Sequence, residues 1–155
     1  MEESSSASDR EFLEELRRHR AELRESMSAL EDALAAPATA DLSRWTQRVE
    51  AALVEVAGDF RAHVEITEGP NGLYVELLAT SPRLAGPVDD LTRDHVLIGG
   101  QIDDLLSRVA DPDVTAAVDG VRRSATALLG RIVRHRQRGS DLVFEAYEFD
   151  IGGET

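Results

Sequence analysis

Apolar residues recur at intervals of three and four along most of the chain, a spacing that places them on one face of an α-helix. The first such run begins at Ser8, which with Glu11 has the spacing of a capping box, and ends before Pro37. A second run follows Asp41 and is broken by the Gly-Pro-Asn-Gly sequence at 69–72. These two runs predict two long helices.

The second half of the chain shows the same periodicity. Residues 73–80 carry enough apolar positions for one or two further helical turns. At 81–82 and again at 111–112 a polar residue is followed by proline, which is favoured in the first position of a helix. The apolar runs that follow extend to Val109 and Ala146. No strand-like alternation of comparable length competes with these four long helices.

Four long amphipathic helices with short connections favour one architecture. We expect an all-α fold, an antiparallel up-down-up-down four-helix bundle with a short extra helix between the second and third long helices. The bundle is expected to span residues 8–148. Residues 1–7 are polar and acidic without an apolar anchor, which predicts a disordered leader, and residues 149–155 predict an irregular tail.

The composition narrows the chemistry. With 155 residues, 42% of them hydrophobic, the chain is long enough for one domain with a real core. The absence of cysteine excludes thiolate zinc sites, iron–sulfur clusters and disulfides. A formal net charge of -13 argues against nucleic acid as a partner. Since neither a secretory signal nor an apolar run of about eighteen residues occurs, we expect a soluble, cytoplasmic protein without a membrane partner.

The four histidines of the chain lie on the apolar faces of four different predicted helices. They are His19, His63, His95 and His135. In an antiparallel bundle these positions fall toward the same end, with offsets of a turn or two at about 1.5 Å per residue. Neutral imidazoles that converge in an apolar interior need a partner, and a transition-metal ion supplies one. The histidine pattern therefore predicts a metal site.

These histidines and their surroundings resemble the haemerythrin-like family, the HHE cation-binding domains. The segments that carry the resemblance are LRRHRAEL, FRAHVEITEGPNGL, LTRDHVLI and RHRQRGSDLVFEAY. The family has a histidine on each of four helices and carboxylates on helices 2 and 4. The resemblance implies one or two non-haem iron ions, and the expected metal ligands are His19, His63, Glu68, His95, His135 and Asp141.

The two carboxylates do not stand at the usual spacing of the family. Thr67 occupies the usual helix-2 position, and the acid follows one residue later, at Glu68. Asp141 lies six residues after His135, a step that rotates its side chain by about 240° from the histidine on a regular helix. We therefore expect Glu68, rather than Asp141, to be the carboxylate nearest the histidines. Tyr147 is a candidate substitute for the helix-4 carboxylate.

Three other residues bear on the site, and a fourth is expected at the opposite end of the bundle. Gly99 and Gly139 stand in or beside the apolar faces of the predicted helices, which we call seams. There they either permit close helix packing or leave room for a small ligand. Tyr74 belongs to the histidine end as a phenolate, a hydrogen-bonding group or a residue that closes the bundle. Trp45 is expected in the core at the opposite end.

The resemblance implies a protein that binds O2, NO or peroxide, or that senses iron, and it leaves open whether the chain is an enzyme. One alternative is a metal-free interaction or ligand-binding module in which the histidines form a hydrogen-bonded or pH-responsive cluster. Another is a haem protein that uses two of the histidines. The sequence leaves the number of iron ions and the oligomeric state open.

Overall fold

The computed structural model describes the backbone of residues 2–111 and 118–152 and the side chains of 7–111 and 118–147. These parts are helical apart from short connections, and they contain no strand. The elements are α1 (Glu2–Ala35), α2 (Leu42–Glu68), α3 (Leu73–Thr80), the 3₁₀ turn η1 (Pro82–Leu84), α4 (Ala85–Ala110) and α5 (Val118–Gly152). The all-helical class predicted from the apolar spacing is confirmed.

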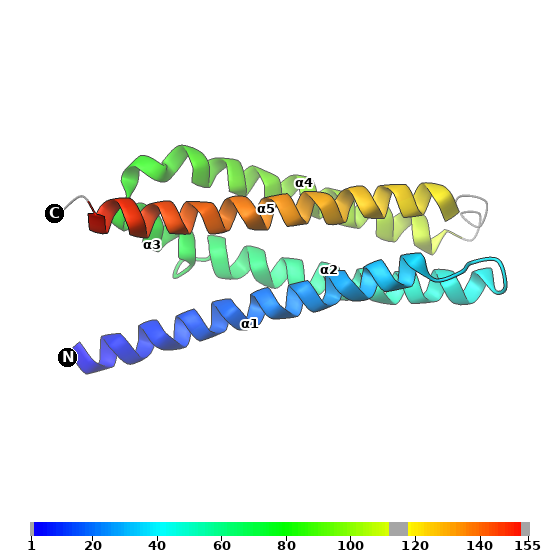
Figure 1. Cartoon of the computed structure of the whole chain (residues 1–155), viewed down its shortest axis with the longest axis horizontal. Helices are drawn as coiled ribbons and strands as arrows, with labels where there is room; N and C mark the ends of the chain where they lie inside the picture. Colours follow the sequence, from blue (N-terminus) through cyan, green and yellow to red (C-terminus); the bar gives the residue numbers. More distant parts are fainter. Residues whose placement is uncertain (1, 112–117, 153–155) are drawn as a thin grey trace.

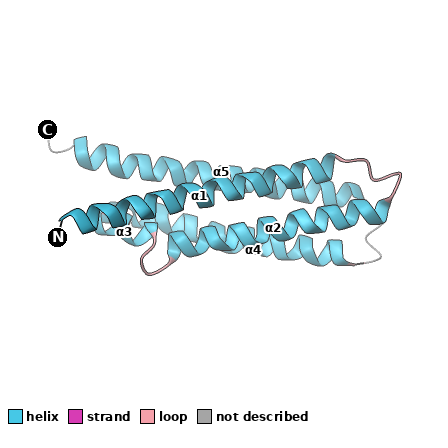
Figure 2. Cartoon of the chain, turned by 90° about the horizontal axis from the view of Figure 1, so that it is seen from below, coloured by secondary structure: helices cyan, strands magenta, loops and turns pink. Residues whose placement is uncertain are grey.

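The long helices run along a common axis, with loops confined to their ends (Figure 2). The connection from α1 to α2 lies at one end of the molecule, together with the end of α4 and the beginning of α5 (Figure 1). Both termini and α3 lie at the other end. Local signals act as expected at the start of α2, where the Asp41 side chain accepts a hydrogen bond from the Arg44 backbone N–H at 3.0 Å.

Several helix boundaries differ from the sequence-based prediction. α1 begins at Glu2, so residues 2–7 of the expected leader are helical; acidic residues in a first turn favour a helix because they face the positive end of its dipole. α5 continues to Gly152, past the expected start of the tail at 149. Residues 1 and 153–155 lie outside the described residues.

The apolar interior consists of two clusters. The main cluster contains residues of all four long helices, among them Leu30, Val56, Ile98 and Ile132, each fully buried. It also contains Trp45, as the sequence predicted. No helix of the described chain combines the length and the apolar character that crossing a bilayer requires.

The second cluster, which we call the terminal cluster, lies at the end that holds α3 and the termini. It is formed by α3, η1, α4 and α5, and its buried members are Tyr74, Leu77, Leu84, Val88, Leu91, Leu142 and Ala146. Among the described side chains, none from α1 belongs to it. Toward its N-terminus α1 diverges from α5 (Figure 1).

Candidate metal centre

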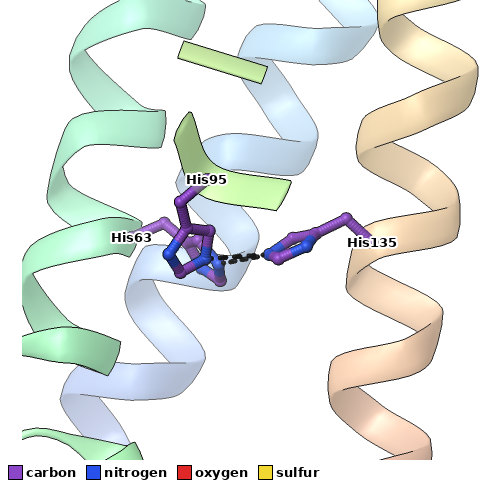
Figure 3. A group of neighbouring side chains, drawn as sticks. All are labelled: His63, His95 and His135. Atoms are coloured by element: carbon purple, nitrogen blue, oxygen red, sulfur yellow. Dashed lines mark hydrogen bonds between the residues drawn. The ribbon is translucent and has the colours of Figure 1, made fainter. Parts of the chain in front are cut away.

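Three of the four histidines converge between α2, α4 and α5 (Figure 3). The Nε2 atom of His135 lies 3.0 Å from Nε2 of His95 and 3.2 Å from Nε2 of His63. One nitrogen from each ring lies within 4.8 Å of the other two. His95 and His135 are buried, with 4% and 1% of their surfaces exposed. We call these three side chains the histidine triad.

The triad continues the apolar seams of its helices, which is why the rings point inward. His63 and His135 come three residues after Phe60 and Ile132, both of the main cluster. The ring of Phe60 lies 5.7 to 6.3 Å from all three imidazoles. On the other side of the triad, the ring of Tyr74 stacks on His95, with 5.9 Å between centroids and 9° between planes. Aromatic rings thus hold the imidazoles in place.

Two carboxylates hold the outer nitrogens of the triad. Nδ1 of His95 lies 2.5 Å from Oε2 of Glu68, and Nδ1 of His135 lies 3.2 Å from Oδ2 of Asp94. Asp94 is buried, and the guanidinium of Arg138 donates to the same Oδ2. Since an ionised carboxylate only accepts hydrogen bonds, both Nδ1 atoms carry the proton. This is the arrangement that fixes the tautomer of metal-binding histidines.

The fixed tautomer has a consequence for the centre of the triad. With the proton on Nδ1, the Nε2 atoms of neutral His95 and His135 each present a lone pair, and they face each other at 3.0 Å. In the neutral rings these two lone pairs repel each other, and a metal ion bound by both nitrogens would relieve the repulsion. The donor set of three imidazoles suits iron, zinc, copper and nickel.

Electrostatics keep the triad in the neutral form that binds metals. Burial, together with repulsion by His95, His135 and Arg136, lowers the pKa of His63 from 6.5 to about 3. Burial also lowers the pKa values of His95 and His135, despite the opposing effect of their carboxylates. The pKa of Tyr74 is raised to about 12, chiefly by burial. At neutral pH the centre therefore contains neutral imidazoles and a neutral phenol.

Two residues of the predicted ligand set, His19 and Asp141, belong neither to the triad nor to the carboxylates that hold it. The ring of His19, on α1, has Nε2 3.6 Å from Glu15 Oε1 and Nδ1 3.9 Å from Glu22 Oε2. The side chain of Asp141 is exposed and accepts a hydrogen bond from Gln137 at 2.9 Å. Because α5 is continuous through this region, Asp141 keeps the orientation away from His135 that its six-residue spacing predicts.

Of the two predicted carboxylates, the structure brings Glu68 and not Asp141 to the histidines, as expected. Glu68 contacts the outer nitrogen of His95 and does not face the Nε2 atoms. The Thr67 hydroxyl, at the usual carboxylate position of the resembled family, donates to the backbone carbonyl of His63 at 2.8 Å.

Sequence reasoning missed Asp94 and Arg138. Arg138 lies one turn after His135, on the same side of α5, and Asp94 directly precedes His95. An acid beside one seam histidine and a base one turn from another is a signal for a buried ion pair between neighbouring helices. That signal could have identified the contact of Asp94 with His135.

A cavity of about 280 Å³ lies beside the triad, between α1, α2, α3 and α5. His19, His63 and His135 line it, together with apolar side chains from the four helices. Gly139 also lines it, and a Cβ atom added there would meet nothing within 4 Å. The same holds for Gly99. Close helix packing therefore explains neither glycine, and Gly139 leaves room next to the triad.

The candidate centre is thus defined by the contacts of its own residues: three inward imidazoles, two carboxylates behind them and an apolar cavity beside them. No family model, no curated protein and no solved structure matches this chain.

Proposed function

We propose that the chain is a haemerythrin-like, up-down-up-down four-helix protein of the cytoplasm that binds one non-haem iron ion in the histidine triad. The observation that supports it is the approach of three Nε2 atoms, together with the carboxylates of Glu68 and Asp94 that hold the rings of His95 and His135 from behind. Iron is the ion implied by the resemblance of the histidine segments to that family, and imidazole is a suitable ligand for it. We assign a single ion because His19 lies outside the triad.

Each residue has a distinct task in this proposal. The triad supplies three neutral nitrogen ligands. Glu68 and Asp94 orient two of the rings and increase the basicity of the nitrogens that face the ion. Arg138 balances the charge of buried Asp94, which would otherwise be costly to bury. Bound iron would supply affinity for a small ligand such as O2, NO or peroxide.

The cavity gives such a ligand a place beside the triad. His63 and His135 belong to the triad and also line the cavity. The cavity therefore reaches the triad from the side of α1. Its walls are largely apolar, which limits the number of water molecules that compete with a diatomic ligand. The open space at Gly139 favours this access.

The direct test is the iron content of protein that has been expressed with iron and purified anaerobically. We expect about one iron per chain and an optical change on addition of NO. His135→Ala should abolish both, because this residue contacts both other rings. His19→Ala is the matched control and should keep the iron, since its ring lies outside the triad.

Two outcomes would contradict this proposal. The first is iron loss in His19→Ala with retention in His135→Ala, which would place the ion elsewhere. The second is a colourless protein without metal whose melting temperature is unchanged by chelator, which would favour the metal-free module.

A further inference from the structure

The cavity beside the triad has a charged edge that the proposed iron chemistry does not use. Arg17, Arg20 and Arg136 line it, and Glu76 is the one acidic residue among the lining residues of the described chain. This is the reverse of the composition of the whole chain, in which 30 acidic residues outnumber 17 basic ones.

Two of these arginines lie next to each other without a carboxylate partner. Arg136 donates to the backbone carbonyl of Arg20 at 3.4 Å, and Arg20 donates to the Ser140 hydroxyl at 2.9 Å. Arg136 also lies close enough to Arg20 and Arg24 to be repelled by both. Within the side chains that the structure describes, neither Arg20 nor Arg136 forms an ion pair. Adjacent like charges with only neutral partners are favourable for binding an anion.

Apolar side chains form most of the rest of the cavity wall. Phe12 and Leu16 of α1, Leu77 of α3 and Val143 of α5 are among them. A volume of about 280 Å³ lies near the lower limit of ordinary ligand sites, which measure about 300–1,000 Å³. An inorganic anion would leave these apolar walls exposed to water, whereas a ligand with a hydrocarbon part would bury them.

We propose that this cavity binds a small organic carboxylate whose hydrocarbon part fills the apolar space and whose carboxylate pairs with Arg20 and Arg136. Bidentate pairing with guanidinium groups suits the planar carboxylate. Although His63 and His135 also line this cavity, Arg20 and Arg136 recognise the carboxylate, so its binding does not require the proposed iron.

Octanoate is the probe, titrated calorimetrically into the full chain in the presence of chelator. We expect saturable binding of one octanoate per chain, and at least tenfold weaker binding of octylamine, whose charge is opposite. The double variant Arg20→Gln/Arg136→Gln should weaken octanoate at least tenfold. Arg134→Gln is the matched control on the same helix and should bind octanoate like the wild type, since Arg134 does not line this cavity.

A second variant tests the cavity and is expected to fold. Gly139→Leu places a side chain in the open space at the cavity wall, and a helix-favouring residue replaces glycine. It should remove octanoate binding and retain the helical circular dichroism signal. Gly58→Leu is the control, because Gly58 is also helical and unobstructed but does not line the cavity.

Three results would overturn the proposal: no saturable binding of octanoate to the wild type, equal binding to the double arginine variant, or equal binding to Gly139→Leu. Since every titration is performed without metal, a failure of iron binding leaves the octanoate result interpretable.

Discussion

The main cluster and the terminal cluster are built from the same kinds of apolar residues but enclose space differently. In the main cluster all four long helices contribute, and residues such as Leu30 and Ile132 have no exposed surface. In the terminal cluster α3 packs with α4 and α5, while α1 contributes no described side chain. Four contributing helices fill the interior, whereas the departure of α1 leaves a cavity beside α3 and α5.

The histidine triad lies between the main cluster and the terminal cluster. In the main cluster, Ile98 follows His95 by one turn and Ile132 precedes His135 by one turn. In the terminal cluster, Tyr74 stacks on His95. The apolar clusters on both sides supply the stability that a layer of buried polar rings does not. The comparison shows that a cluster of buried imidazoles can occupy one layer of the helices without altering the apolar faces on either side.

The largest expected effect is a difference in the loss of stability between a variant in the main cluster and a variant at the cavity wall. Ile132→Ala should reduce the free energy of unfolding by about 2–5 kcal/mol, because it creates a cavity around a fully buried position. Leu16→Ala should cost about 1 kcal/mol or less, since this side chain borders the cavity and is only partly buried. Urea denaturation of the metal-free protein measures both. Equal losses would show that the two regions are packed alike.

Acid should destabilise the triad layer of the metal-free protein. The unfolded chain protonates His63 as the pH falls below 6.5, whereas the folded chain resists protonation until about pH 3. Stability should therefore be highest above pH 6.5 and decline from there toward pH 3. His95 and His135, whose pKa values are also lowered, act in the same direction.

Melting temperatures measured across this range test the pH effect. In His63→Leu the decline should be shallower. A decline as steep as that of the wild type would remove His63 as its source.

The role of the carboxylate that contacts His135 can be tested without changing the three histidines. Asp94→Asn should weaken metal binding about 10- to 100-fold, because the amide no longer holds His135 Nδ1–H as a charged acceptor. Competition with a coloured chelator measures the affinity. Asp90→Asn is the control, since Asp90 is exposed and pairs only with nearby Arg93 at 3.7 Å in the described chain. Equal affinities of the wild type and Asp94→Asn would contradict a role for this carboxylate.

The smallest effect is a gain in stability. Gly139→Ala should stabilise the protein by up to about 1 kcal/mol, because its Cβ meets nothing within 4 Å and alanine favours a helix. Gly72→Ala should act in the opposite direction, since a Cβ there would lie 2.7 Å from the Thr67 carbonyl oxygen. Thermal unfolding of the two variants compares them. Destabilisation by Gly139→Ala would show that the cavity is closed at this position.

The apolar spacing was sufficient to predict the long helices and which residues face inward. It also predicted that seam histidines converge, because the height of a residue along a helix follows from its number. It could not reveal that His19 lies apart, since spacing defines the face of α1 but not the distance of α1 from α5.

The carboxylates show the same limit. Asp141 was doubtful from its six-residue step on one helix, and the structure places its side chain in solvent. Asp94 was missed because successive residues on a helix point about 100° apart, so its contact with His135 depends on how α4 lies against α5. Contacts within a helix follow from spacing, whereas contacts between helices depend on their relative rotation.

Because α1 diverges from α5, entry into the cavity and release of an ion from the triad would depend on different helices. The triad belongs to α2, α4 and α5, so a displacement of the first half of α1 widens the cavity without changing the distances between the three nitrogens. Entry of a small molecule into the cavity then depends on the position of α1. Escape of an ion from the proposed metal site would instead require a separation of α2, α4 and α5.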